Sequence, residues 1–224
     1  MLRWKAVLFD LDGTLVDTAP DLVGAVQELA QERDLPIPGF SDLRKMASHG
    51  APGLLGTAFG LATSDPRYTL MRLDFLRLYR ARAHRQSALF PGISETLQQL
   101  QHEQIPWAIV TNKSEELARE LVAGLALPSP PAILVGGDTT AEPKPSPLPV
   151  RFALEHLDIG ADRTLLVGDD RRDIEAAHAA GCTAWAAAWG YWQECNPPGA
   201  WGADAILRNT LELRSCLLAN QLHE

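Results

Sequence analysis

Short apolar runs alternate along the chain with longer stretches in which apolar residues recur at helical spacing. Four uninterrupted apolar runs stand out, at 6–9, 107–110, 132–135 and 164–167, and two weaker ones follow at 184–188 and 205–207. Uninterrupted hydrophobicity is typical of parallel strands that helices cover on both faces. The stretches between them include helix patterns such as Ile93, Leu97 and Leu100. This alternation predicts an α/β fold with a Rossmann-like parallel sheet.

The stretch between the first and second runs is far longer than one crossover helix requires. It contains several apolar stripes at helical spacing, one of which comprises Tyr68, Met71, Phe75, Leu78 and Tyr79. We therefore expect a helical domain at 16–89, inserted into a core formed by 1–15 and 90–224.

Two segments carry unusual numbers of glycines or prolines. The glycines between His49 and Gly60 argue against one uninterrupted helix, because each interior Gly costs about 1 kcal/mol, and they favour a turn near Gly50. The prolines from Pro143 to Pro149 predict a stiff, extended loop.

Two carboxylates, Asp10 and Asp12, follow the first apolar run in the sequence FDLDGT. Residues i and i+2 of an extended segment point to one side, and their mutual repulsion requires a cation or a proton between them. Gly13 then permits a tight turn or a close phosphate approach. The alternative for this motif alone is a pair of solvated turn aspartates.

A second acidic cluster, Asp169, Asp170 and Asp173, follows the fourth run in GDDRRD. Parallel strands end at one edge of the sheet, so we expect these carboxylates to approach Asp10. Such hard oxygen donors suit Mg²⁺. Capping of the following helix is the alternative, and we expect it to explain Asp170 or Asp173 in part.

Thr111 and Asn112 follow the second run, where a hydroxyl and backbone N–H groups at a helix N-terminus favour phosphoryl oxygens. Lys144 lies in EPKPSP, where flanking prolines would hold its ammonium toward an anion. Taken singly, the threonine is more typical of a helix cap and the lysine of a solvated loop.

Composition narrows the possible partners. Lys and Arg number 20 against 28 Asp and Glu, giving a formal net charge of -8, which disfavours nucleic acid as a partner. The three cysteines suit reduced thiols better than disulfides. No apolar window approaches the length of a membrane span, so we expect a cytoplasmic protein without membrane contact. No pattern indicates an oligomeric state.

In order and position, DLDGT, Thr111, Lys144 and GDDRRD resemble the four motifs of the haloacid dehalogenase superfamily, and the long insertion resembles its helical C1 cap. The resemblance implies a phosphoric monoester hydrolase. It makes Asp10 the nucleophile and Asp12 the acid that protonates the leaving oxygen and later activates water.

The same resemblance assigns the remaining site residues. Thr111 and Lys144 would bind the phosphoryl group, with Gly13 and Asn112 beside them. Mg²⁺ would be bound by Asp10, Asp169 and the Asp12 carbonyl, with outer support from Asp170 or Asp173.

Further likeness narrows the substrate to a small phosphorylated metabolite. VTNK and the C-terminal third, which includes WGY at 189–191, resemble the phosphoglycolate phosphatase group and a branch of it that acts on N-acetylmuramic acid 6-phosphate in bacterial cell-wall recycling. The turn at Ser48, His49 and Gly50 is expected to reach over the site, where His49 is a candidate contact for a substrate carboxylate.

Four other functions are alternatives to this hypothesis. A phosphomutase of the β-phosphoglucomutase type shares every motif, and a catalytically silent phosphate-binding domain would share the fold. Asp12 disfavours dehalogenation, because dehalogenases resemble this chain in the nucleophile but lack the second aspartate. A nucleotide-binding Rossmann domain is disfavoured because GxGxxG is absent after the first run.

Overall fold

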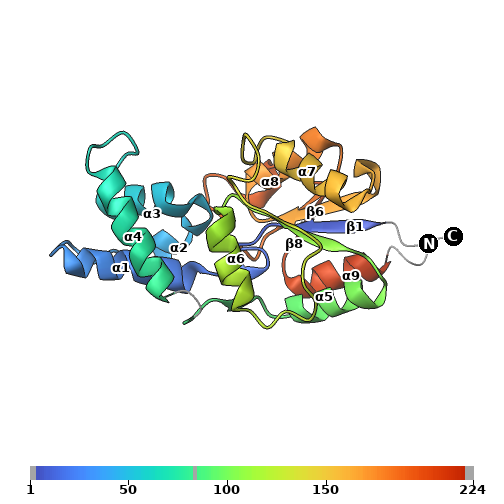
Figure 1. Ribbon diagram of the computed structural model, residues 1–224, viewed down its shortest axis with the longest axis horizontal. Coiled ribbons are helices and arrows are strands. Elements are labelled where there is room, and N and C mark those ends of the chain that lie inside the picture. The colour runs from blue at the N-terminus through green and yellow to red at the C-terminus, as the bar shows by residue number, and fades with distance from the viewer. Residues whose placement is uncertain (1–3, 83–84, 220–224) are drawn as a thin grey trace.

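A six-stranded parallel sheet with helices on both faces forms the centre of the computed structural model, which describes residues 4–82 and 85–219 (Figure 1). The α/β prediction is therefore confirmed. The strand order is β5-β4-β1-β6-β7-β8. The strands are β1 (Ala6–Phe9), β4 (Trp107–Val110), β5 (Leu134–Val135), β6 (Thr164–Gly168), β7 (Thr183–Ala187) and β8 (Ala205–Leu207).

Burial on both faces explains the uninterrupted apolar runs. In β1, Val7 and Phe9 belong to one hydrophobic cluster and Leu8 belongs to another. The first cluster includes Ile93 from one side of the sheet, and the second includes Ile174 from the other. A strand whose successive side chains all meet a helix layer has no solvent-facing position for a polar residue.

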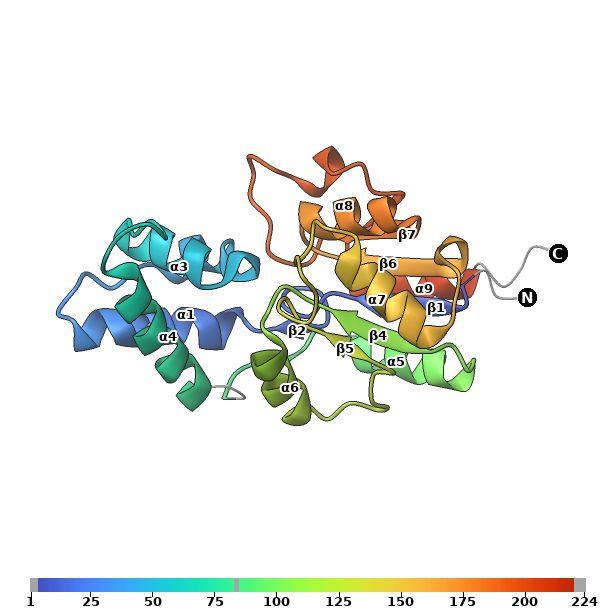
Figure 2. The ribbon, with the colours of Figure 1, turned by 45° about the horizontal axis from the view of Figure 1, so that its top comes forward.

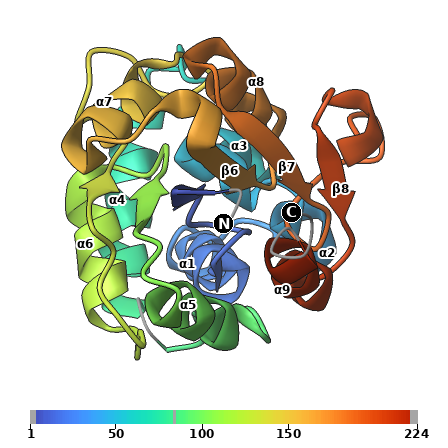
Figure 3. The ribbon, with the colours of Figure 1, turned by 90° about the vertical axis from the view of Figure 1, so that its right-hand side faces the viewer.

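Four helices cover the two faces, and a fifth flanks the edge near β5. Figure 3 shows α5 and α9 on one face and α7 and α8 on the other. The helices are α5 (Ile93–His102), α6 (Glu115–Ala123), α7 (Leu148–Leu157), α8 (Arg171–Ala180) and α9 (Thr210–Ala219), with short 3-10 turns η2 (Ala161–Arg163) and η3 (Pro198–Ala200). The extended loop predicted to reach Pro149 ends earlier, because Pro149 takes a first-turn position of α7, where a missing N–H costs nothing.

A separate group of helices lies beyond the carboxyl ends of the strands (Figures 1 and 2). We call these the cap helices: α1 (Ala19–Glu32), α2 (Phe40–Arg44), η1 (Ala47–His49), α3 (Gly50–Phe59) and α4 (Tyr68–Arg82). Two short antiparallel strands, β2 (Val16–Asp17) and β3 (Ala88–Leu89), join them to the sheet. The chain thus leaves and re-enters the sheet region through one paired linker.

The glycine-rich segment of the cap helices differs in part from its prediction. A turn does occur at Gly50, whose φ is 56°, but α3 then continues through Gly53 and Gly56 without interruption. A Cβ on Gly53 would lie 2.4 Å from the Cβ of His49. Gly53 therefore permits close packing of α3 on the preceding turn, which offsets its low helix propensity.

None of the helices in the described part of the chain is long and apolar enough to cross a membrane.

Candidate active site

The sheet brings together residues that follow three neighbouring strands. Asp10 follows β1, Thr111 follows β4 and Asp169 follows β6, and all three side chains are buried. The chain enters β4 on one side of β1 and later β6 on the other, and such a reversal opens a crevice at the carboxyl ends of parallel strands. The candidate residues occupy that crevice.

Lys144 lies at the centre of the crevice and is 3% exposed. Its Nζ donates to Asp10 Oδ1 at 2.8 Å and also to Asp173 Oδ1 and the Val110 carbonyl. Burial alone would lower the pKa of this ammonium, but Asp10 and Asp173 raise it well above its ordinary value. Lys144 is therefore a fixed positive charge next to Asp10.

The predicted residue Asn112 positions that lysine. Its amide Nδ2 donates to the Lys144 carbonyl at 2.8 Å, and its Oδ1 accepts from the Lys144 backbone N–H at 2.9 Å. Asn112 also lines the crevice together with Thr111. The side chain predicted to bind substrate is thus already engaged in fixing the lysine loop.

Two further carboxylates, Asp169 and Asp173, lie close to Asp10. Oxygens of Asp10, Asp169 and Asp173 lie within 4.8 Å of one another. Burial, together with Asp10 and Asp173, raises the pKa of Asp169 well above the ordinary value of 3.8. Burial also raises the pKa of Asp173 to about 7, although Lys144 opposes the shift. Buried carboxylates in such proximity favour a bound cation, and an all-oxygen donor set fits Mg²⁺.

Each oxygen of Asp169 is held by a nearby donor. Thr14 Oγ1 donates to Oδ1 at 3.1 Å, while the Tyr191 backbone N–H and Ser48 Oγ donate to Oδ2 at 2.7 and 3.0 Å. Ser48 Oγ also lies 3.2 Å from the Asp12 carbonyl oxygen, which was predicted to bind the metal. The hydroxyl of a cap residue thus reaches the same place as the predicted metal ligands.

Gly13 makes this approach possible. Its φ is 92°, and a Cβ at this position would lie 2.1 Å from Asp169 Oδ2. The glycine thus provides the predicted tight turn, and the group that approaches it closely is the carboxylate of Asp169.

Asp12 is held by two donors that the sequence analysis did not single out as site residues. Thr18 Oγ1 donates to Asp12 Oδ1 at 2.6 Å, and Lys113 Nζ lies 2.9 and 3.1 Å from its two oxygens. The same ammonium lies 4.8 Å from the centroid of the Tyr79 ring on α4. Only the position of Lys113 in VTNK, directly after two predicted site residues, could have indicated its role.

Asp170 and Asp173 cap α8, as the alternative interpretation predicted. The Arg172 backbone N–H donates to Asp170 Oδ1 at 2.9 Å, and the Asp170 N–H donates to Asp173 Oδ2 at 3.0 Å. Asp173 additionally belongs to the carboxylate cluster. The Arg172 guanidinium pairs with Asp170 and donates to the Ser48 carbonyl at 2.9 Å, which ties α8 to the cap helices.

His49 and Gly50 line a larger hollow next to the crevice. His49 Nε2 lies 4.0 Å from Asp170, and its Nδ1 is buried without a hydrogen-bond partner among the described residues. Burial, and to a lesser extent Arg172, lowers the pKa of His49. The imidazole of His49 therefore lines the hollow in surroundings that disfavour its charged form.

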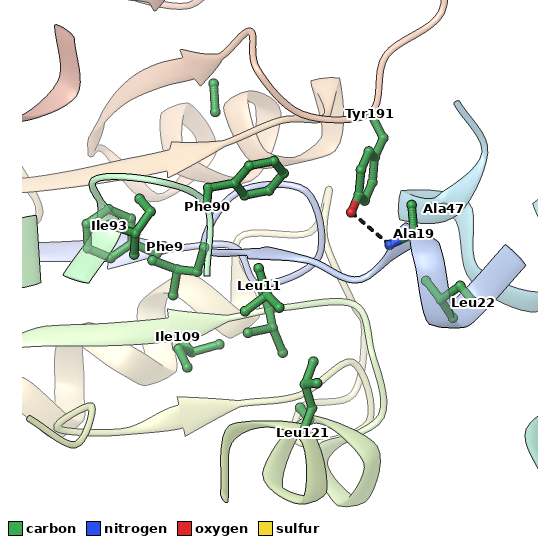
Figure 4. Packing of buried hydrophobic residues seen from close by; sticks show 14 of the residues in the cluster. Phe9, Leu11, Ala19, Leu22, Ala47, Phe90, Ile93, Ile109, Leu121 and Tyr191 are labelled. Carbon is green, nitrogen blue, oxygen red and sulfur yellow. Dashed lines mark hydrogen bonds between the residues drawn. The ribbon is translucent and has the colours of Figure 1, made fainter. Parts of the chain in front are cut away.

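Tyr191 is a further residue whose position the sequence did not reveal. Its hydroxyl donates to Asp17 Oδ1 at 2.5 Å and accepts from the Ala19 N–H at 2.9 Å (Figure 4). The guanidinium of Arg44 lies 4.7 Å from its ring centroid. Tyr191 therefore contacts the linker and the cap helices, while its own N–H binds Asp169.

Comparison with known proteins agrees with this geometry. Residues 7–187 match the family model described as haloacid dehalogenase-like hydrolase. The chain is 41% identical over 209 residues to a phosphoglycolate phosphatase of Xanthomonas campestris pv. campestris, covering 93% of this chain and 94% of that protein. It is 36% identical over 216 residues to an N-acetylmuramic acid 6-phosphate phosphatase of Pseudomonas putida, covering 96% and 97%.

Solved structures show the same architecture. A crystal structure of a predicted phosphoglycolate phosphatase from Haemophilus somnus 129PT superposes with a TM-score of 0.86 at 26% identity, and the match covers 96% of this chain and 99% of the other.

Proposed function

Because the chain belongs to the haloacid dehalogenase-like hydrolase family, we propose that it is a magnesium-dependent phosphatase that hydrolyses a small phosphomonoester through a phosphoaspartate at Asp10. One observation carries this proposal. At the edge of the sheet, Lys144 donates to one oxygen of Asp10, while Asp169 and Asp173 approach Asp10 closely enough to share a cation with it.

In the first step, Asp10 attacks phosphorus. Lys144 donates a hydrogen bond to Asp10 Oδ1. Asp10 Oδ2 accepts no hydrogen bond from the described part of the chain and is available as the nucleophile. As the bond from Oδ2 to phosphorus forms, the bond from phosphorus to the leaving oxygen breaks, and Asp12 gives that oxygen a proton.

In the second step, water attacks the phosphoaspartate and Asp12 takes a proton from it. The bond between Asp10 and phosphorus breaks, which releases inorganic phosphate and restores the carboxylate. Thr18 Oγ1 and Lys113 Nζ hold the side chain of Asp12 in place at the crevice, so the group that gives a proton to the leaving oxygen in the first step can take one from water in the second.

The residues that would bind Mg²⁺ are Asp10, Asp169 and the Asp12 carbonyl, with Asp173 beside them and Asp170 supporting the start of α8. When bound, the ion supplies positive charge that offsets charge on the phosphoryl oxygens. Thr111 and the backbone around Gly13 would contact the same oxygens.

We further propose that residues 1–15 and 90–224 act as the catalytic core and that 16–89 act as a cap over it. The relatives support two substrates, phosphoglycolate and N-acetylmuramic acid 6-phosphate.

The test is release of phosphate from phosphoglycolate, N-acetylmuramic acid 6-phosphate, hexose phosphates, nucleoside monophosphates and p-nitrophenyl phosphate, with Mg²⁺ or with a chelator. We expect turnover with Mg²⁺ that the chelator abolishes. Asp10→Asn should retain its circular dichroism spectrum and lose turnover. Full activity of purified Asp10→Asn would refute the mechanism.

The same assay separates the alternatives. A phosphomutase would convert a hexose phosphate to its isomer without net phosphate release, and a catalytically silent domain would release phosphate from none of these compounds.

A further inference from the structure

The crevice opens into a second, larger hollow that the proposed chemistry does not use. Its volume is about 330 Å³, which is within the range of pockets that hold small organic ligands. The hollow and the crevice share five lining residues, Asp12, Ser48, Asn112, Lys113 and Arg172. A phosphomonoester with its phosphoryl group at Asp10 therefore has room for its organic part in this hollow.

One face of α4 forms the wall of the hollow that belongs to the cap helices. Arg72, Leu76 and Tyr79 all line it, and their spacing of four and three residues places them on the same side of the helix. Tyr79 stands at the catalytic end, since its ring contacts Lys113, which binds Asp12. Arg72 lies seven residues away, or about 10 Å along the helix axis.

The three strong cations of the hollow differ in their partners. Lys113 is matched by Asp12, and Arg172 is matched by Asp170. Arg72 forms no ion pair with any residue in the described ranges, and it is exposed. In a chain of net charge -8, an unmatched guanidinium in a pocket is a candidate contact for a substrate anion.

Apolar side chains form much of the remaining wall, among them Leu22, Phe75 and Leu117. Such a surface suits the carbon skeleton of a ligand better than a second highly charged group. A single guanidinium also matches the single charge of a carboxylate, whereas the phosphoryl site beside Asp10 is built for a dianion, with a buried lysine and a proposed metal ion.

We propose that this hollow is the subsite for the organic part of the substrate and that Arg72 binds a carboxylate there, separated from the phosphoryl group by a spacer about the size of a sugar ring. This inference rests on the proposed phosphatase function and narrows its substrate to a phosphorylated sugar acid. Phosphoglycolate has only one carbon between its carboxylate and its phosphate oxygen, whereas Arg72 lies about two helical turns from Tyr79, so we expect the subsite to favour a longer substrate.

Two sugar phosphates form a pair for the test. N-acetylmuramic acid 6-phosphate carries a lactyl ether that ends in a carboxylate, and N-acetylglucosamine 6-phosphate has a hydroxyl in its place. The measurement is the ratio of their kcat/KM values in the full-length enzyme with Mg²⁺. The variants are Arg72→Gln, Arg72→Lys and the control Arg77→Gln, whose parent side chain lies on α4 and pairs with Glu32.

We expect the unaltered enzyme to prefer the carboxylated sugar, and Arg72→Gln to reduce that ratio about tenfold or more, because a charge-assisted hydrogen bond is lost. The loss should appear mainly in KM. Arg72→Lys should restore part of the ratio, and Arg77→Gln should retain all of it. An unchanged ratio in Arg72→Gln, or a preference for a sugar bisphosphate in the unaltered enzyme, would overturn the inference.

Failure of the proposed function would look different. If the unaltered enzyme released no phosphate even from p-nitrophenyl phosphate, the phosphatase proposal would fall. Binding to Asp10→Asn, measured by calorimetry, still tests the subsite in that event: tighter binding of the carboxylated sugar, weakened by Arg72→Gln, supports it, and equal binding of both sugars contradicts it.

Discussion

At the scale of single residues, several of the buried charges at the site lie in ion pairs. Lys113 is the clearest case, since its ammonium is enclosed and bonded to Asp12. Removing one member of a buried ion pair leaves the other unpaired, which usually costs more than the pair contributes. The energetics of Asp12 and Lys113 should therefore be strongly coupled.

A double-mutant cycle on this pair tests that coupling. Lys113→Met should lower the free energy of unfolding by about 3 kcal/mol, because the Asp12 charge loses its cation. Adding Asp12→Asn removes the charge and should recover about 1–3 kcal/mol relative to the sum of the two single changes. Urea unfolding of the four proteins gives the coupling energy, and simple additivity would contradict this account of the pair.

Single residues also show what the sequence could reveal. Asp10, Asp12, Thr111, Lys144 and Asp169 were predicted to converge because each lies next to an apolar run or in a biased loop, and the structure brings them together. Ser48 is predicted only as part of the turn expected to reach over the site, and Thr18 and Tyr191 carry no such signal. Their roles depend on contacts between segments far apart in the chain, which local patterns do not encode.

At the scale of elements, strand prediction succeeded where burial on both faces produces long apolar runs. It missed the two-residue strands β2 and β3 because neither lies in one of the uninterrupted apolar runs. Low helix propensity argued against an uninterrupted α3, but close packing on the preceding turn outweighs the cost of an interior glycine.

The two interior glycines of α3, Gly53 and Gly56, form a matched pair for testing whether packing outweighs helix propensity. Alanine normally stabilises a helix by about 0.5–1 kcal/mol relative to glycine, and Gly56→Ala should do so because its nearest neighbour would lie 3.7 Å away. Gly53→Ala should instead destabilise the protein by about 1–3 kcal/mol, since its Cβ would overlap His49. Thermal or urea unfolding distinguishes the two signs, and equal effects would show that the packing is not constraining.

At the scale of the whole molecule, crowded carboxylates make stability depend on pH and on metal together. The pKa of Asp169 is raised, and that of Asp173 is raised to about 7. The folded protein without metal therefore keeps protons that the unfolded chain has released. The stability from this source is complete below the ordinary aspartate pKa of 3.8 and is lost as pH rises through about 7.

Magnesium should compensate for that loss, because it competes with the same protons. We expect the increase in melting temperature caused by Mg²⁺ to be larger near pH 8 than near pH 5.5, by an amount that calorimetric scans resolve. Asp169→Asn is the control and should show a much smaller increase at either pH. An equal increase at both pH values in the unaltered protein would contradict the proposed ligands.

Tyr191 connects the carboxylate cluster to the linker and the cap helices. Its backbone N–H donates to Asp169, while its hydroxyl donates to Asp17 and accepts from the N–H of Ala19, the first residue of α1. The rigid ring of Tyr191 links these contacts. A movement of the cap helices that displaces the phenol would also displace the backbone N–H that donates to Asp169. The position of the cap helices is therefore coupled to the geometry of the carboxylate cluster.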